Sequence, residues 1–331
     1  MLSSALKIIA AAVIAALFGG FLLTGALTTQ QAERMAPAAS TSGPGTFSPA
    51  GSLERARSHH TATLLPDGRV LVVGGFDPIT NQIAGVPSAE AWEPASSSFA
   101  PAGSLTTPRD LHTATILPDG RVLVIGGFTP VSSVEAWDQA TETFTRVGSL
   151  AGPRSLSTAT LLSDGRILIV GGFGAGLTSA ELWDPATGAS EPAGSLTDGR
   201  SSHTATLLPD GRVAVIGGWD EKPGTLGTIE VWDPATLTFE VAAKLFEPRD
   251  AHTATLMDDG TVLIIGGAVG KSVERWDPAT GKSRRVGVLV RRREGHTATL
   301  LPDGRVLVVG GENWGNGRIF ASTEIWHPQL D

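Results

Sequence analysis

The sequence predicts an all-β fold, a six-bladed β-propeller, from three observations. The stretch at residues 60–75 (HTATLLPDGRVLVVGG) has five near copies, which begin at spacings of 44 to 52 residues. Each copy is followed by a short run that ends in Glu-x-Trp, and then by a further short run such as SFAPAGSL at residues 98–105. Gly, Pro and Asp separate these runs, as is typical of strands joined by turns. Four short strands repeated around an axis form a propeller.

Each repeat supplies four predicted strands. The His-Thr-Ala-Thr-Leu-Leu run is the first, and a Pro-Asp-Gly turn follows it, because Gly accepts the positive φ of a tight turn. The second strand is continuously apolar, which is typical of a strand that is buried on both faces. The third strand ends at the repeated Trp, and a turn such as Asp-Pro-Ala-Thr leads to the fourth. The six predicted blades span about residues 54–105, 106–150, 151–196, 197–245, 246–289 and 290–331.

The two ends of the propeller region, residues 46–331, complement each other. The last repeat ends at Asp331 after its third strand, whereas residues 46–53 (TFSPAGSL) have the pattern of a fourth strand that belongs to no blade. We expect residues 46–53 to complete blade six by pairing with the strand that contains residues 324–326. Closing the ring in this way removes strand edges that would otherwise be exposed.

An uncharged apolar run at residues 8–27 follows Lys7 and is long enough to span a bilayer as a helix outside the propeller. It is interpreted either as a cleaved signal peptide, with Thr24 and Ala26 as small residues for processing, or as an uncleaved signal anchor. Residues 28–45 have the composition of a flexible linker. Either interpretation predicts a secreted propeller or a membrane-anchored propeller outside the cytoplasm.

Composition excludes several functions. The 331-residue chain has no Cys, so it has no disulfide, no thiolate zinc site and no Cys nucleophile. Its net charge of -8 argues against nucleic-acid binding, which requires a basic face. Residues 284–293 contain a local group of Arg, which is interpreted as a solvated edge strand and loop.

The Gly-Gly doublets, the aromatic of each Glu-x-Trp motif and the Arg-x-x-His run before most first strands resemble the Kelch family of six-bladed propellers. The resemblance covers residues 46–331, with Trp where the family often has Tyr. The Kelch family includes copper radical oxidases similar to galactose oxidase, whose chemistry needs Tyr ligands, one of them cross-linked to Cys. This sequence has neither residue type, so that activity is rejected. A sugar epimerase similar to the sialic-acid mutarotases, with an Arg, a His and a Glu at the central channel, stays open.

Polar residues that recur in every blade are interpreted as structural. One Glu lies two residues before each Trp, so we expect six Arg–Glu ion pairs, histidines that hydrogen-bond the backbone between blades, and Trp rings that pack between blades. Five His near an axis also suggest a metal site, but no spacing demands a metal, and neither a cofactor nor a catalytic residue is predicted. In blade one these repeated positions are Arg57, His60, Gly74, Gly75, Glu90 and Trp92.

Departures from the repeat are the candidate binding residues. The loop after each Gly-Gly and the connection into the next first strand share one face, which varies between blades. The ligand-binding candidates there are Asp77, Asp110, Trp219, Asp220, Asp250, Glu312, Asn313, Trp314 and Arg318. Aromatics flanked by carboxylates and amides are typical of peptide-binding or sugar-binding surfaces. The sequence therefore favours a monomeric, extracytoplasmic module that binds a protein or a glycan over an enzyme or a membrane-anchored structural envelope protein.

Overall fold

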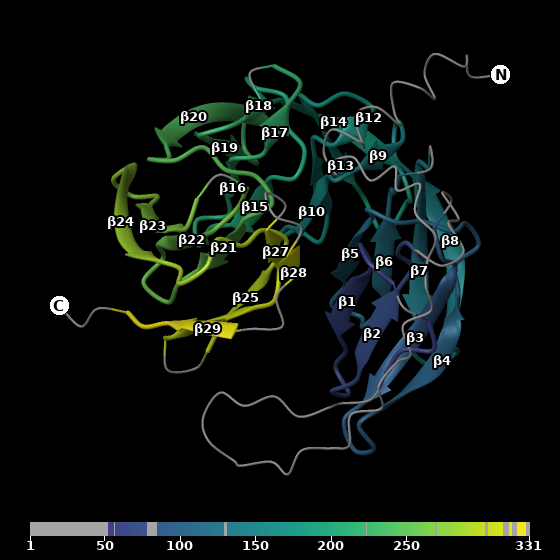
Figure 1. Cartoon of the computed structure of the whole chain (residues 1–331). Helices are drawn as coiled ribbons and strands as arrows, with labels where there is room; N and C mark the ends of the chain where they lie inside the picture. Colours follow the sequence, from purple (N-terminus) through teal and green to yellow (C-terminus); the bar gives the residue numbers. More distant parts are fainter. Residues whose placement is uncertain are drawn as a thin grey trace, which may run out of the picture.

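The computed structural model of the chain describes residues 52–55, 57–77, 85–128, 131–222, 224–268, 270–301, 304–313, 318–319 and 323–328. These residues form an all-β, six-bladed propeller, as the repeat predicts, and the innermost strands of the blades surround the axis in Figure 1. The apolar run at residues 8–27, the linker and Trp314 lie outside the described residues. Within the described residues there is no helix long and apolar enough to cross a membrane.

Blades one to five are four-stranded antiparallel sheets whose strands follow one another in chain order. Blade one contains β1 (Thr61–Leu64), β2 (Val70–Val73), β3 (Ser88–Glu93) and β4 (Ser98–Ser104). Blade two contains β5 (Thr113–Ile116), β6 (Val122–Ile125), β7 (Ser133–Asp138) and β8 (Thr143–Ser149). Blade three contains β10 (Thr158–Leu161), β11 (Ile167–Val170), β13 (Ser179–Trp183) and β14 (Ser190–Ser195).

The remaining blades repeat this order. Blade four contains β15 (Thr204–Leu207), β16 (Val213–Ile216), β19 (Thr228–Asp233) and β20 (Thr238–Lys244). Blade five contains β21 (Thr253–Leu256), β22 (Val262–Ile265), β23 (Ser272–Asp277) and β24 (Lys282–Val288). The described strands of blade six are β25 (Thr297–Leu300), β26 (Val306–Val309) and β29 (Thr323–Trp326).

The core lies between neighbouring blades. Five apolar clusters join successive blades from one to six, and the second strand of each of blades two to five is buried along its whole length. The repeated Trp of each of blades two to six packs against the preceding blade, and the indole nitrogen of Trp137 donates to the Ala102 carbonyl at 2.9 Å. Trp137, Trp183, Trp232 and Trp276 are fully buried. Packing between blades therefore explains why the ring recurs in every repeat.

The boundary between blades six and one differs from the other five. Leu64 on β1 is 66% exposed and Ile325 on β29 is 36% exposed. Of the segment 46–53, which we expect to complete blade six, residues 46–51 lie outside the described residues. Their closing role therefore stays a prediction.

Candidate functional site

The repeated Arg and Glu pair within each blade, as the sequence pattern predicts. Arg109 is fully buried, and its guanidinium donates to the Gly126 carbonyl at 3.0 Å and to the Glu135 carboxylate at 2.5 Å. The other pairs are Arg57–Glu90, Arg154–Glu181, Arg200–Glu230, Arg249–Glu274 and Arg293–Glu324. Because burying ions is costly unless they are paired and hydrogen-bonded, these groups hold the fold together and are not available to a ligand.

The Gly-Gly doublets bring the backbones of two blades into contact. The N–H of Gly127 donates to the Arg154 carbonyl of the next blade at 2.7 Å. Gly126 has a φ of +69°, and a Cβ there would collide with the same carbonyl. Only Gly tolerates both conditions, so the doublets are structural.

The repeated histidines form side-chain bonds between blades. Nε2 of His112, His203, His252 and His296 lies 2.9–3.0 Å from the Thr hydroxyl that begins the first strand of the preceding blade. The bonds join blades through a Thr side chain, and backbone hydrogen bonding to Ile265 of the preceding blade, of the kind that the sequence predicts, also acts on His296. Burial lowers the pKa of His112 and His203 to about 3 and that of His296 to about 4, so these imidazoles are neutral at physiological pH.

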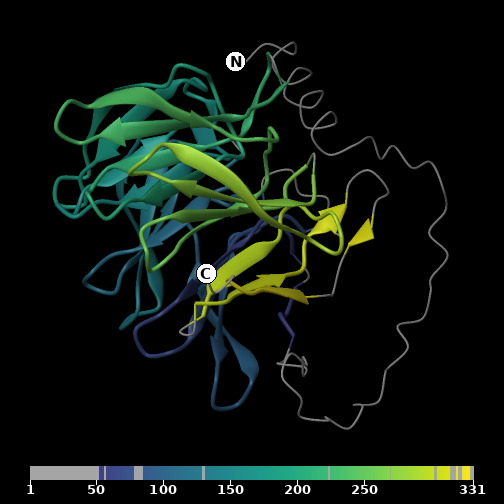
Figure 2. The same cartoon turned by 90° about the vertical axis from the view of Figure 1, so that its left-hand side faces the viewer.

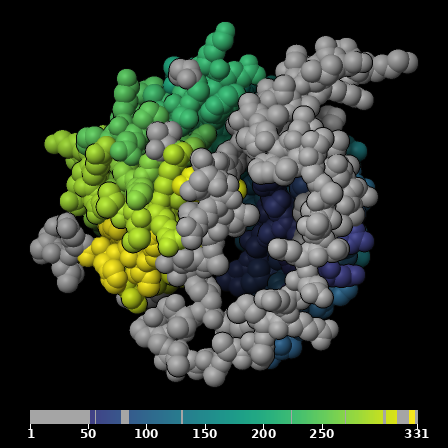
Figure 3. All heavy atoms as spheres, in the orientation of Figure 1, coloured from purple at the N-terminus to yellow at the C-terminus, as the bar shows by residue number. Residues whose placement is uncertain are grey.

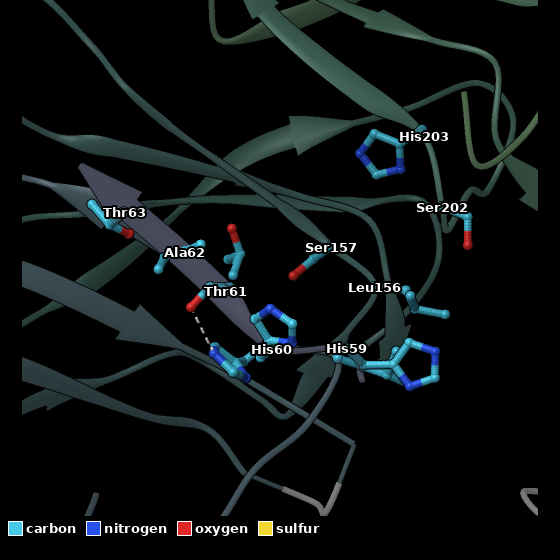
Figure 4. A pocket seen from close by; sticks show the side chains of 13 residues that line it. His59, His60, Thr61, Ala62, Thr63, Leu156, Ser157, Ser202 and His203 are labelled. Carbon is cyan, nitrogen blue, oxygen red and sulfur yellow. Dashed lines mark hydrogen bonds between the residues drawn. The ribbon is translucent and has the colours of Figure 1, made fainter. Parts of the chain in front are cut away.

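Ser157 replaces the repeated His in blade three. A cavity of about 410 Å³ lies beside it, at the end of the central channel where the first strands of blades one to four begin. In the view of Figure 4, the Ser157 hydroxyl lies between the rings of His60 and His203. Figure 3 shows a hollow beside the purple atoms of blade one. The cavity is lined by His, Thr, Ser, Ala and Leu from blades one to four, without Arg or Glu. An Arg, a His and a Glu do not converge there, because the repeated Arg and Glu bind each other inside the blades. Within the described ranges, no three potential metal ligands come together either.

A ring of left-handed residues surrounds the mouth of the channel. The residue before each repeated His or Ser has a positive φ: His59, Leu111, Leu156, Ser202, Ala251 and Gly295. From Leu156 to Gly295, each N–H donates to the carbonyl of the equivalent residue in the preceding blade at 2.9–3.2 Å. We call this set the backbone ring. Sequence analysis missed it, because five of the six residues are not Gly and no pattern of residue types marks the position.

The candidate residues after the Gly-Gly doublets form short two-stranded structures on the loop face. In blade four, β17 (Trp219–Asp220) pairs with β18 (Gly224–Thr225). In blade six, β27 (Glu312–Asn313) pairs with β28 (Arg318–Ile319), and Figure 2 shows these short yellow strands apart from the longer yellow strands of the blade. Trp219, Asp220, Glu312 and Asn313 are all partly exposed. These four candidates are therefore accessible to a large ligand.

An aromatic residue that sequence analysis missed supports this surface. The ring of Phe173, on β12 (Phe173–Gly174) in blade three, lies 5.9 Å from the Trp219 ring, centroid to centroid. An aromatic follows the doublet directly in blades one to four, as Phe76, Phe128, Phe173 and Trp219. This repeated aromatic position is the sequence signal from which Phe173 could have been predicted as part of the surface.

Three acidic candidates are buried instead. Asp77, Asp110 and Asp250 are only 4–9% exposed. Gly85 in the loop of blade one packs against the backbone of Arg109 and Asp110, leaving no room for a Cβ, so one blade's loop covers the next blade's connection. Burial raises the pKa of Asp110 to about 6, and its Oδ1 has no hydrogen-bond partner in the described part of the chain. These carboxylates lie beneath the binding face and not on it.

The repeat is also recognisable by comparison. Residues 112–151, which include most of blade two, match the Kelch motif. No curated protein matches the sequence. The matched segment contains the Gly-Gly doublet, Glu135 and Trp137, and the same elements recur in the other five blades. The chain is a six-bladed β-propeller that contains a Kelch motif in blade two and repeats the elements of that motif in every blade.

Proposed function

We propose that the chain is a protein-binding propeller that acts outside the cytoplasm and engages its partner through the loop face. Kelch propellers are commonly protein-interaction modules. The observation that carries the proposal is the contrast between a uniform scaffold and two dissimilar hairpins, β17–β18 and β27–β28, which present partly exposed Trp219, Asp220, Glu312 and Asn313. A rigid scaffold that positions variable loops is a common arrangement for recognition.

The location rests on the sequence of residues 8–27, an uncharged run long enough to cross a bilayer. A retained run anchors the propeller by its N-terminal linker, and a cleaved run releases it. The N-terminal residue of the mature protein, determined by sequencing, separates these two cases. An N-terminus near residue 27 indicates cleavage.

The binding proposal is tested by cross-linking the full chain to partners in its native host. We expect Trp219→Ala to reduce the yield of the cross-linked complex about tenfold, because an exposed aromatic ring is a typical interface anchor. Pro234→Ala, in an exposed turn at the opposite end of blade four, is the matched control and leaves the yield unchanged. An unchanged yield with Trp219→Ala, at an unchanged melting temperature, contradicts the loop-face proposal.

A glycan is the second ligand class for the same face, because an aromatic ring beside carboxylate and amide groups also suits a sugar. A glycan array probed with the wild-type chain and with Trp219→Ala tests it. Glycan binding that Trp219→Ala abolishes, together with no cross-linked protein, favours this class over a protein partner.

A further inference from the structure

A second surface of the propeller combines exposed apolar side chains with positive charge. Phe246 is 58% exposed, and Val288 and Val290 are each 75% exposed. Single exposed apolar residues are ordinary, but a contiguous group of large ones marks an interaction site. We call these three residues, together with Lys271 and Arg285, the rim patch.

Contacts within blade five and between blades five and six link the members of the rim patch. The Arg285 guanidinium on β24 lies 5.7 Å from the centre of the Phe246 ring. Nζ of Lys271 donates to the Val290 carbonyl at 3.1 Å, and the Lys271 carbonyl accepts from the N–H of Leu289, which separates Val288 from Val290. Phe246, from the connection that follows β20, and Val290, from the connection that follows β24, therefore both lie near β24, the outer strand of blade five.

The apolar residues depart from the repeat at positions where the fold does not require them. Phe246 and Val290 each follow a buried Leu, and the other blades have Glu54, Thr106, Ala151 and Thr197 at this position. The N–H groups of Phe246 and Val290 donate to Glu274 and Glu324 at 2.7–2.8 Å, as the N–H of Thr106 donates to Glu135. The backbone at this position is held in the same way whatever the side chain. Folding therefore does not require the apolar side chains of Phe246 and Val290, which can serve another purpose.

Positive charge surrounds the apolar residues. Lys271, Arg285 and Arg291 are all exposed. Glu247, which bonds to Arg285 at 2.7 Å, offsets only part of this charge. In a chain of net charge -8, this local positive field attracts an acidic partner that the rest of the surface repels.

We propose that the rim patch binds an acidic segment of a partner protein, in which large apolar side chains alternate with Asp or Glu. The apolar residues of the segment pack on Phe246, Val288 and Val290, and its carboxylates pair with the surrounding Lys and Arg, in the usual arrangement of an apolar centre and a polar rim. This inference rests on the proposed protein-binding function and adds a second contact surface, at the outer edge of blades five and six.

The test uses the full chain in a non-ionic detergent and three fluorescent peptides. One alternates Phe and Leu with Glu and Asp, the second has Lys in place of the acidic residues, and the third has Ser in place of Phe and Leu. We expect affinity for the first peptide to exceed affinity for the other two by about tenfold and to fall as salt is raised.

Variants then assign the binding to the rim patch. Phe246→Thr with Val290→Thr restores the residue found in blades two and four, and we expect it to weaken binding of the first peptide about tenfold. Lys271→Glu with Arg285→Glu should weaken it as much and reverse the preference between acidic and basic peptides. Val241→Thr, at a 48% exposed apolar residue on β20 outside the patch, should leave affinity within about twofold.

Equal binding of all three peptides, or unchanged affinity in both double variants, overturns the proposal. So does a preference of the patch for phosphatidylglycerol over the acidic peptide, which indicates a membrane contact, or self-association that the double variants abolish, which indicates a second copy. A native partner whose cross-linking requires Trp219 but not the rim patch overturns this inference and leaves the proposed function intact.

Discussion

The hydroxyl of Thr158 in blade three lies 2.9 Å from Nε2 of His203 in blade four, although the two residues are 45 positions apart in the sequence. His203 is 5% exposed, so the bond is sheltered from water. The same bond joins Thr61 to His112, Thr204 to His252 and Thr253 to His296. The described part of the chain contains no such bond between Thr297 and His60, which is exposed.

Replacing His203 by Ala should destabilise the propeller by about 2–4 kcal/mol, because it leaves a cavity and an unpaired Thr hydroxyl between two blades. The free energy of unfolding in urea measures this effect. His60→Ala is the matched control at the same repeat position, and we expect a change of less than about 0.5 kcal/mol. Equal losses in both variants contradict a stabilising bond at His203.

Acidification should weaken the fold. Burial lowers the pKa of His112 and His203 to about 3, that of His296 to about 4 and that of His252 well below its usual value. The unfolded chain, with His pKa values near 6.5, binds more protons than the folded chain in the window between these values. Stability from these groups is therefore complete above pH 6.5 and is lost as the pH falls below it. Urea unfolding at pH 7 and pH 4.5 measures the loss, and His203→Ala should reduce it.

Replacing Asp110 by Asn should stabilise the fold at pH 8 but not at pH 4. Because burial raises the pKa of Asp110 to about 6, its charged form destabilises the folded chain above that pH. The amide removes this charge, with an expected gain on the order of 2 kcal/mol. Asp210→Asn is the control, since hydrogen bonding by Arg212 lowers the pKa of the exposed Asp210 and its loss should bring a small destabilisation. A gain from Asp110→Asn that is equal at both pH values contradicts the assignment.

Replacing Gly126 by Ala should destabilise the fold by more than about 3 kcal/mol, because the new Cβ collides with the Arg154 carbonyl of the next blade. Gly165→Ala separates this effect from backbone strain. Gly165 has a φ of +87°, but a Cβ added there would meet no atom within 4 Å, so we expect a loss of about 1 kcal/mol. Similar losses at the two positions show that strain, and not contact between blades, explains the doublet.

Deleting residues 46–53 should lower the melting temperature, since we expect this segment to complete blade six. Deleting residues 36–43 in the linker, a change of equal length, should have no effect on the melting temperature. Leu64 and Ile325 provide a direct readout, because hydrogen exchange around them should increase only after the first deletion. A melting temperature that neither deletion changes removes the role of residues 46–53 in closing the ring.

The sequence predicts this fold well because each blade satisfies the same local requirements. Alternating turns and apolar runs specify the strands, and the recurrence of one Arg and one Glu in each of the six repeats, Arg57 and Glu90 in blade one, specifies the ion pairs. The bond between Thr158 and His203 could not be predicted in this way, because it depends on how two blades face each other. The burial of Asp110 depends on a loop without periodic pattern. Phe246 and Val290 did carry a signal, a departure from the repeat, but at a strand end and not in the loops after the doublets.

The bonds of the backbone ring leave the side chain at each position free to vary among residues that tolerate a positive φ. These bonds use only N–H and C=O groups, which every residue other than Pro supplies. The six positions accordingly hold His, Leu, Leu, Ser, Ala and Gly. The mouth of the channel can therefore acquire a new chemical character by single substitutions without disconnecting the blades, which makes it a favourable place for the protein to evolve, or for an engineer to install, a different specificity.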